Sequence, residues 1–454
     1  MLLRTGCASL GPVRPRVFRP VEPQAPAAGE ARGHPTPAGI RRWKSFLGPG
    51  LITGASDDDP SGIATYSQAG AQFGFDMGWT LIVTFPLMCA VQEVSARIGR
   101  VTGRGLAGNF RRYFPRALVY PTILLLVFAN TINLGADLGA MGAALELVLG
   151  GPAHLYVILF ALLSCALEIF TRYARYQSIL KWLTLSLFSY VAVLLVVRAP
   201  WMEVGAHLLV PRFKLDSDAL ALIVAILGTT ISPYLFFWQA QQEVEDTKVG
   251  EGARPLIRAP EQSAVELRRI HLDTYVGMGF SNLVALSILL AAATTLHARG
   301  ITDIQTSAQA AEALRPVAGE FAFLLFALGI IGTGLLALPV LAGSAAYALG
   351  EILDWHVGLS RAPGHAKLFY SVIAAATLLG TLINFTELDP VRALVWAAVV
   401  NGVAAVPILA LILLLGSRSD AMGAFTTPRA LSVLGWLTTF ILAFAAIGMI
   451  ATAQ

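Results

Sequence analysis

An interrupted apolar stretch at residues 46–74, FLGPGLITGASDDDPSGIATYSQAGAQFG, constrains the fold more than any other feature. It is long enough to cross a bilayer as a helix, yet its middle carries three successive acids (Asp57, Asp58 and Asp59) and then Pro60. Proline removes a backbone donor and clashes with the preceding turn, which predicts a break in the helix. Freed backbone groups and ionised carboxylates are costly in hydrocarbon, so the break must lie inside protein or against water. The stretch therefore predicts a cation site at the membrane midplane.

Apolar segments of spanning length recur along nearly all of the 454 residues. The chain is 56% hydrophobic and only 13% charged, whereas ordinary soluble domains are roughly 25% charged. A helix of about 20 residues spans about 30 Å, the thickness of the hydrocarbon core. No connecting segment is long enough to bury a core of its own. We therefore predict an all-α polytopic membrane protein with about 11 transmembrane helices.

The predicted spans, called helices 1 to 11, cover residues 46–73, 78–99, 118–149, 153–171, 180–198, 218–245, 273–296, 319–347, 368–385, 391–415 and 430–452. Most of the 32 Lys and Arg fall in loops that this order places on one side. That bias predicts a cytoplasmic N-terminus in a plasma (inner) membrane, and it removes nucleic acid as an explanation for the net charge of +4. The three cysteines show neither paired metal spacing nor a disulfide framework.

Residues 1–40 are rich in Pro, Arg, Gly and Ala and contain no apolar run of spanning length. This composition predicts a disordered cytoplasmic tail. An organellar targeting peptide is the alternative, which the prolines disfavour because they oppose an amphipathic helix. The segment 199–217 is predicted to be a polar outer loop that can hold a short interfacial helix.

Helix 6 is interrupted as well. In ALALIVAILGTTISPYLFFWQ, small polar residues and Pro233 replace the apolar pattern at mid-span. Helices 1 and 6 lie five spans apart and so enter the membrane from opposite sides. Two matched breaks point to an inverted-repeat transporter. We predict a core at 41–417 with repeats at 46–198 and 218–415, and an extra transmembrane helix within 418–454.

The first broken stretch resembles the first-helix signature of the NRAMP divalent-metal transporter family. There the break reads Asp-Pro-Gly-Asn and is followed by a similar Ile-Ala-Thr and Gln-Ala-Gly pattern. ARIGRVTGRGLA after helix 2 and LGTTISPYLFFWQ in helix 6 resemble further motifs of that family, and the likeness runs from residue 46 to about 415. The resemblance implies a LeuT-like fold of ten helices in two inverted repeats, plus helix 11. It also implies a transported divalent metal ion, contact with the lipid bilayer and no cofactor.

The resemblance also implies roles for single residues. Asp59 falls on the metal-binding aspartate of the family, and Gly62 stands where the family has a ligand asparagine. Thr229 falls on a position that offers a backbone carbonyl. Ser232 replaces the metal-binding methionine, and Tyr234 replaces a histidine tied to proton transfer.

Asn401 falls on a polar position of helix 10 that can join the coordination shell. The proton route of the family also uses acids on helix 3 and an arginine on helix 9. Here the middle of helix 3 keeps only Asp137, beside Asn133, and FYSVIAAATLLGTLINF in helix 9 contains no basic residue. This pattern looks like the NRAMP-related magnesium transporter branch, which carries Mg²⁺ and Mn²⁺ without evident proton coupling.

The ligand chemistry favours the same ions. Methionine sulfur suits transition metals, whereas carboxylate, carbonyl, hydroxyl and water suit Mg²⁺ and Mn²⁺. Mg²⁺ keeps several waters, and Gly62 and Ser232 leave room for them. We predict import of Mg²⁺, and also Mn²⁺, by alternating access without proton coupling. The alternatives are a proton-coupled Mn²⁺/Fe²⁺ transporter of the NRAMP type and a sodium-coupled solute symporter.

Structural roles compete with ligand roles at most of these positions. Asp59 could simply cap the half-helix that starts at Ser61. The hydroxyls of Ser232 and Thr229 could bond back to the preceding helical turn, and Asn401 could join two helices. The further residues predicted to line the site are Asp58, Ser61, Thr230, Tyr234 and Asp137. An intramembrane aspartyl protease would need a second carboxylate in a comparable break, which the chain lacks, and the sequence leaves the oligomeric state open.

Overall fold

A computed structural model of the protein describes residues 53–54, 56–170, 188–196, 199–211, 216–249, 252–359, 363–386 and 389–452. All of them belong to one compact unit, Ser45–Gln454. The predicted tail at 1–40 and the start of predicted helix 1 lie outside the described residues. Within those residues the regular structure is helical throughout, as the sequence predicts.

Eight helices or joined helix pairs among the described residues are long and apolar enough to cross a membrane. They are α4 (Gly78–Thr102), α6 (Arg116–Leu149), α7 (Ala153–Phe170), the pair α11 (Ser217–Thr230) and α12 (Pro233–Val249), α13 (Ser263–Thr295), α16 (Ala322–Leu353), α18 (Pro390–Gly416) and α20 (Arg429–Thr452). The three other predicted spans correspond to shorter helices, α3 (Pro60–Phe73), α9 (Phe188–Val196) and the apolar α17 (Lys367–Ile383). Each predicted span thus has a helix in the described part of the chain, and the predicted all-α membrane fold is confirmed.

Short helices join the spans. They are α5 (Leu106–Tyr113), α10 (Trp201–Leu209), α14 (Ser307–Ala311), α15 (Arg315–Ala318) and α19 (Ser419–Met422), with 3₁₀ turns η2 (Pro260–Gln262), η3 (His297–Arg299), η4 (Glu312–Leu314), η5 (Gly319–Phe321), η6 (Pro363–His365) and η7 (Gly423–Phe425). The short helix expected in the 199–217 loop is α10, where Met202 and Leu209 are exposed, as suits an interfacial helix.

The sequence prediction starts helix 7 about ten residues later than the structure does. The structure starts α13 at Ser263, inside the polar segment that was predicted to be a loop. Ion pairs explain this extension. Arg269 of α13 pairs with Glu243 of α12, and Glu266 of α13 accepts from Arg100 of α4 at 3.1 Å. Paired charges let the helix continue beyond its apolar part.

Both predicted breaks are present, and each second half begins with a proline. Residues 53–54 and 56–57 are helical, the chain bends at Asp58, and Asp59 is extended (φ −70°, ψ 171°) before α3 starts at Pro60. Likewise α11 ends at Thr230, Ile231 leaves helical geometry (φ −119°, ψ 53°), and α12 starts at Pro233. Proline suits the first position of a helix because its missing N–H would have no partner there.

Glycine contacts hold the broken segments deep in the bundle. A Cβ at Gly228 of α11 would lie 2.0 Å from the carbonyl oxygen of Ala398 in α18. A Cβ at Gly70 of α3 would lie 2.1 Å from the carbonyl oxygen of Leu289 in α13. Such close backbone approach is typical of packing between membrane helices. It places both breaks among α3, α11, α13 and α18.

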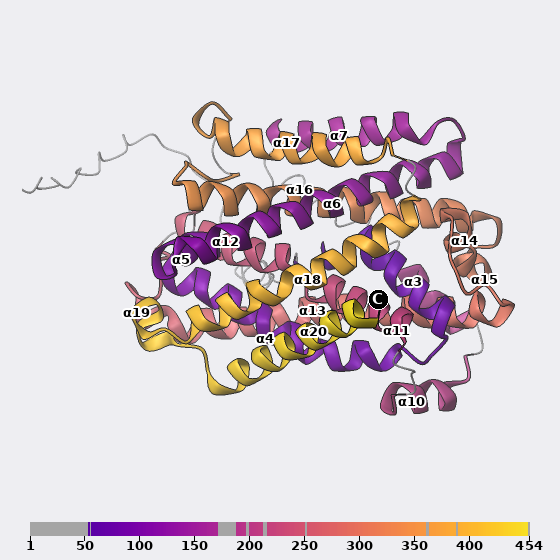
Figure 1. The fold of residues 1–454 in the computed structure, drawn as a ribbon, viewed down its shortest axis with the longest axis horizontal. Coiled ribbons are helices and arrows are strands. Elements are labelled where there is room, and N and C mark those ends of the chain that lie inside the picture. Colours follow the sequence, from indigo (N-terminus) through magenta and orange to yellow (C-terminus); the bar gives the residue numbers. More distant parts are fainter. Residues whose placement is uncertain are drawn as a thin grey trace, which may run out of the picture. The chain divides into compact units, whose positions relative to one another are not determined.

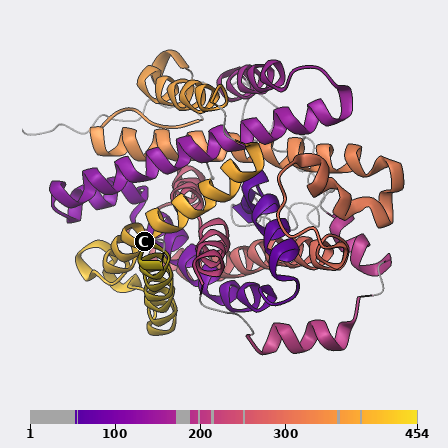
Figure 2. The ribbon, with the colours of Figure 1, turned by 45° about the vertical axis from the view of Figure 1, so that its right-hand side comes forward.

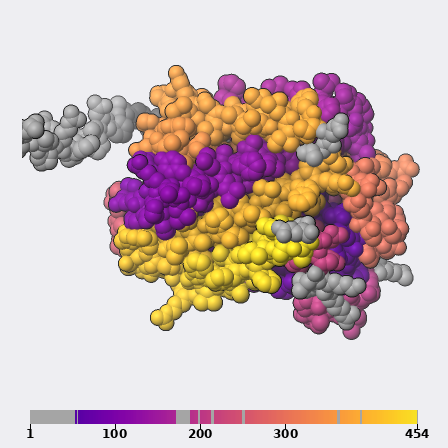
Figure 3. Space-filling model, in the orientation of Figure 1, coloured from indigo at the N-terminus to yellow at the C-terminus, as the bar shows by residue number. Residues whose placement is uncertain are grey.

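Other helices surround this centre. Helices α6 and α16 pack side by side, and α7 and α17 lie together against them in both ribbon views (Figures 1 and 2). Helices α6, α18 and α20 cover much of the face seen in Figure 3. Leu162 on α7, Leu378 on α17 and Phe444 on α20 are among the large apolar side chains that the outer helices expose. Exposed apolar surface of this kind fits contact with lipid.

Candidate metal site

Asp59 occupies the first break and caps α3. Its Oδ1 atom accepts the backbone N–H of Gly62 at 2.8 Å and the hydroxyl of Ser61 at 2.7 Å. An aspartate in this position satisfies free N–H groups of the first helical turn. The capping role that the sequence offered as an alternative is thus present, and it uses one carboxylate oxygen only.

The second oxygen of Asp59 faces other helices. Oδ2 accepts the side-chain amide of Asn133 in α6 at 3.0 Å and the hydroxyl of Tyr234 in α12 at 3.1 Å. The Tyr234 hydroxyl also lies 3.2 Å from the backbone oxygen of Ser56, just before the first break. Asp59 is therefore the point at which the two broken helices and α6 meet.

Asn133 holds a central position that the sequence prediction did not assign to the site. Its amide nitrogen lies 3.3 Å from Oδ2 of Asp137, and its Oδ1 accepts the amide of Asn401 in α18 at 3.2 Å. These contacts orient the amide of Asn133 so that its nitrogen, and not its oxygen, points at Asp59. In the sequence, the feature that could have indicated this role is the position of Asn133 in an apolar span, one helical turn before Asp137, which was predicted to line the site.

Several buried oxygen atoms around this group have no well-aligned hydrogen bond within the described residues. They include Oδ1 of Asp137, Oδ1 of Asn401 and Oγ1 of Thr229. All three residues are 0–1% exposed. An unpaired polar group in the interior is costly, and a cation is one partner that several such oxygens can share.

Gly62 and Thr229 face each other across the two breaks. A Cβ at Gly62 would lie 3.1 Å from Oγ1 of Thr229 and 3.3 Å from the ring of Tyr66. The space beside the Thr229 hydroxyl therefore depends on the absence of a side chain at position 62. The predicted role of Gly62, which was to leave room for a hydrated ion, stays a prediction.

Ser232 and Thr230 bond to their own helix. The Ser232 hydroxyl lies 2.8 Å from the carbonyl oxygens of both Gly228 and Thr229, and the Thr230 hydroxyl donates to Ile226 at 2.8 Å. For Ser232 this is the back-bonding that the sequence gave as the alternative. The Thr229 hydroxyl, for which the same alternative was given, forms no such bond to the described backbone. The lone pairs of Ser232 are not used by this bond, so its role as a ligand stays a prediction.

Asp57 and Asp58 converge on a residue of α13 that the sequence did not single out. The Ser281 hydroxyl lies 2.6 Å from Oδ2 of Asp57 and 3.2 Å from Oδ1 of Asp58. Nothing in the sequence marks this serine, since small polar residues are common in helices that pack closely. The first break thus collects contacts from α6, α12 and α13.

The donor set is made of oxygen, with no sulfur or imidazole among the residues described above. In the described part of the chain, no group of three His, Cys, Asp or Glu side chains has the geometry of a metal centre. A cation here would rely on one or two carboxylates together with amide, hydroxyl, carbonyl and water oxygens. That is the coordination which Mg²⁺ and Mn²⁺ accept.

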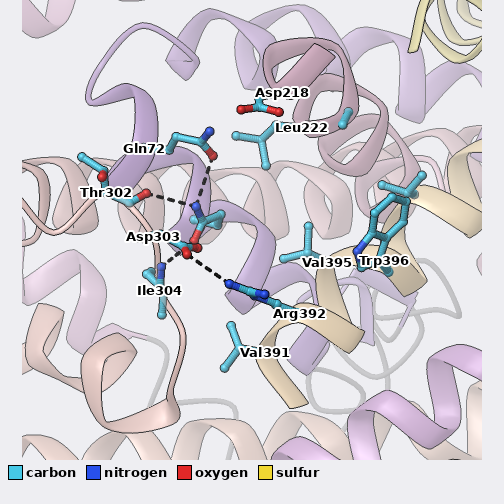
Figure 4. A pocket seen from close by; sticks show the side chains of 13 residues that line it. Gln72, Asp218, Leu222, Thr302, Asp303, Ile304, Val391, Arg392, Val395 and Trp396 are labelled. Atoms are coloured by element: carbon cyan, nitrogen blue, oxygen red, sulfur yellow. Dashed lines mark hydrogen bonds and ion pairs between the residues drawn. The ribbon is translucent and has the colours of Figure 1, made fainter. Parts of the chain in front are cut away.

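A cavity of about 520 Å³ opens at the end of the bundle where α3 ends and α11 and α18 begin. Its walls include Gln72 of α3, Leu222 of α11 and Val395 of α18, as Figure 4 shows. Arg392 and Asp303 form an ion pair at 3.3 Å in this wall. Asp59 caps the start of α3, and Thr229 and Asn401 belong to α11 and α18, so the helices that line the cavity also carry proposed site residues.

Two broken helices that meet at buried oxygens within a bundle of apolar spans define a transporter-type integral membrane protein. The family model described as natural resistance-associated macrophage protein-like (Nramp) matches residues 50–452. The chain therefore belongs to the Nramp family, and the resemblance found in its motifs is confirmed.

Named relatives and a solved structure are similar to this chain. The divalent metal cation transporter MntH of Deinococcus radiodurans is 27% identical over 426 residues, which cover 92% of each chain. MntH of Acidiphilium cryptum is 29% identical over 401 residues, covering 85% of this chain and 86% of that one. The fold matches a crystal structure of the Eremococcus coleocola manganese transporter with a TM-score of 0.73 at 17% identity, covering 92% of this chain and 89% of the other. This match confirms the predicted fold class.

Proposed function

We propose that this protein carries divalent metal cations across a membrane and that it holds the ion where the two broken helices meet. The observation that carries the proposal is the position of Asp59, whose Oδ2 lies at the junction of α3, α6 and α12. Unpartnered oxygens of Asp137, Asn401 and Thr229 surround that junction. Relatives named as divalent metal cation transporters support the same activity.

The proposed ligands are Asp59, Thr229, Ser232 and Asn401, with Gly62 providing space. Residues proposed to line the site are Asp58, Ser61, Thr230, Tyr234 and Asp137. An arriving cation competes for Oδ2 of Asp59 with the amide of Asn133 and the hydroxyl of Tyr234. Either these donors move away, or a water bound to the ion accepts the contact. The breaks supply the flexible points that alternating access requires.

For the transported ion we propose Mn²⁺ as the main cargo. The solved structure with this fold is named as a manganese transporter, so the comparisons support the Mn²⁺ alternative from the sequence better than the Mg²⁺ prediction. The all-oxygen donor set admits Mg²⁺ as a competitor, because both ions prefer oxygen ligands. Membrane placement follows the sequence argument: a plasma membrane with the N-terminus on the cytoplasmic side.

Uptake into proteoliposomes tests the proposal. We expect Mn²⁺ uptake by the wild type and at least a tenfold loss in Asp59→Asn, because the amide keeps the shape but removes the charge. Glu168→Gln is the matched control, since Glu168 is a buried acid in α7 whose bond to Ser164 an amide can keep. Equal uptake by wild type and Asp59→Asn contradicts the proposal.

The same vesicles separate coupled from uncoupled transport. A pH dye inside the vesicles reports acidification of the interior during Mn²⁺ uptake if protons accompany the ion, as the NRAMP alternative predicts. Uptake without acidification supports the uniport predicted from the sequence. Adding Mg²⁺ as a competitor in the same assay shows which of the two ions the transporter prefers.

A further inference from the structure

Polar side chains form a row on one face of α3. The members of this polar row are Ser61, Thr65, Gln68 and Gln72. Since each residue turns a helix by about 100°, this spacing keeps all of them within about 60° of one another around the axis. The row starts at the site, where the Ser61 hydroxyl donates to Asp59. It ends in the wall of the cavity, which Gln68 and Gln72 line. The polar row therefore connects the cavity with the first break over about 10 Å of helix.

Thr65 is a buried member of the polar row that the fold does not use. Its side chain is 0% exposed, and its hydroxyl has no well-aligned hydrogen bond within the described residues. The buried hydroxyls of Thr230 and Thr333, in contrast, donate to the carbonyl oxygen four residues earlier, as is usual in membrane helices. A buried hydroxyl without a bond is costly. A water molecule or a hydrated ion that reaches Thr65 supplies the missing bond.

Gln68 fastens the segment 301–306, which precedes α14, to α3. Its Oε1 accepts the backbone N–H of Ile304 at 2.9 Å, and its Nε2 donates to the backbone oxygen of Thr302 at 3.2 Å. Thr302 and Ile304 lie in the wall of the cavity (Figure 4). One side chain thus bonds to the segment twice, at the end of the polar row that meets the cavity.

The segment has few other anchors. Among residues 302–305, Ile304 is buried and the others are exposed. The ion pair of Asp303 with Arg392 joins the segment to α18, but both side chains are more than half exposed, and exposed ion pairs stabilise little. Segments with few buried contacts open locally at low cost. The two bonds from Gln68 are therefore well placed to control whether the segment lies against α3 or lifts from it.

We propose that the polar row is the path of a hydrated divalent cation between the cavity and Asp59, with Thr65 as a contact on the way and Gln68 as the gate. When the segment 301–306 lifts, the amide of Gln68 loses its backbone partners and turns to the water shell of the ion. The inference rests on the proposed transport function.

The cavity suits such an ion. Six water ligands occupy about 180 Å³ at about 30 Å³ each, which is less than the cavity volume of about 520 Å³. The charged side chains in its wall are Asp218, Asp303 and Arg392. The excess of negative charge attracts cations to the start of the path.

Mn²⁺ uptake into proteoliposomes by Thr65→Val tests the path, because valine keeps the shape and removes the hydroxyl. We expect the initial uptake rate to fall about three- to tenfold, the effect of losing one hydrogen bond. The equilibrium affinity for Mn²⁺, measured on the purified full-length protein by electron paramagnetic resonance of the free ion, should stay within about twofold of the wild type. Ser67→Ala is the matched control: Ser67 is also 0% exposed with no well-aligned hydrogen bond in the described residues, but it points away from the polar row. It should transport as the wild type does.

The outcomes separate the two proposals. A wild type without Mn²⁺ uptake, or one whose uptake Asp59→Asn leaves unchanged, refutes the proposed function itself. Normal wild-type uptake with an unchanged rate in Thr65→Val overturns the path and leaves the function in place. A Thr65→Val variant that loses affinity in proportion to its rate also overturns the path, because Thr65 then belongs to the site at Asp59.

A reporter thiol tests the gate without any transport measurement. Ile304→Cys places it at the buried position of the segment, in a background whose three native cysteines are replaced by alanine. We expect Gln68→Ala to raise the rate of maleimide labelling at least fivefold. Gln68→Glu should give an intermediate rate, because its carboxylate accepts the N–H at position 304 but cannot donate to Thr302. Thermal unfolding checks that each protein is folded. An unchanged labelling rate in Gln68→Ala overturns the gate.

Discussion

At the first break, before α3, Asp57 and Asp59 bond to side chains of other helices, whereas at the second break, between α11 and α12, the hydroxyls of Thr230 and Ser232 bond to backbone oxygens of their own segment. Asp59 reaches Asn133 and Tyr234, and Asp57 reaches Ser281. Ser232 and Thr230, by contrast, donate to carbonyls three or four residues earlier. The first break therefore depends on side chains from distant parts of the chain, while the second depends on how closely its backbone is packed.

This difference predicts that a methyl group at the second break disturbs the fold most. Gly228→Ala would place a Cβ 2.0 Å from the Ala398 oxygen and 2.5 Å from the Gly402 nitrogen, both backbone atoms. The helices must separate, and overpacking of this kind typically costs about 1–3 kcal/mol and occasionally more. We expect lower yield and a lower unfolding temperature of the purified protein. A variant as stable as the wild type contradicts the importance of this close contact.

Asn133→Ala tests the first break and should have the next largest effect. It removes the amide that donates to Asp59 and accepts from Asn401. Partners left without a bond in the interior cost about 1–3 kcal/mol. We expect a clear fall in the unfolding temperature without Mn²⁺. Added Mn²⁺ should recover part of the loss, because the freed oxygen of Asp59 can then bind the ion.

The conservative variant Asn133→Asp sharpens this prediction. It keeps the size of the side chain but adds a negative charge beside Asp59 and Asp137. Its destabilisation should be relieved by Mn²⁺ to a greater extent than that of Asn133→Ala. If Mn²⁺ stabilises neither variant, Asn133 does not act near the ion.

The sequence predicted the breaks well because their causes are local. Proline and consecutive acids in an apolar span have few possible placements. Both half-helices start at the prolines of the breaks, the first at Pro60, one residue before the predicted start at Ser61. The position of Asp59 in the first break was predicted for the same reason. The contacts of Asn133 and Ser281 could not be predicted, since they depend on which faces of α6 and α13 turn toward the break. An asparagine or serine in a membrane helix can also serve to join two helices.

The start of α13 shows a second limit. Its first turns carry charged residues that resemble a loop, and they are helical because Arg269 and Glu266 find partners on other helices. Pairing between distant segments is not visible in local composition. Apolar segments of spanning length therefore located the spans but not the helical extension beyond the apolar part.

Gly62→Ala compares a methyl group at the first break with the one at Gly228. The nearest atom to the new Cβ is the Thr229 hydroxyl oxygen at 3.1 Å, a side-chain atom that can shift by a few tenths of an ångström. We expect a stable fold but a smaller site, with Mn²⁺ affinity reduced about tenfold, which corresponds to about 1.4 kcal/mol. Reduced stability with normal affinity would reverse the contrast between the two breaks.

Ser232→Ala should have the smallest effect on stability. Its hydroxyl donates to carbonyl oxygens of the preceding turn, so the variant loses one local hydrogen bond and no contact with another helix. The loss should be under about 1 kcal/mol, within the usual contribution of one hydrogen bond. Mn²⁺ binding then decides the role of the serine. A severalfold loss of affinity in a stable Ser232→Ala variant marks its oxygen as a ligand. Unchanged affinity leaves Asp59, Thr229 and Asn401 to hold the ion, and the second break then contributes space and backbone rather than a serine ligand.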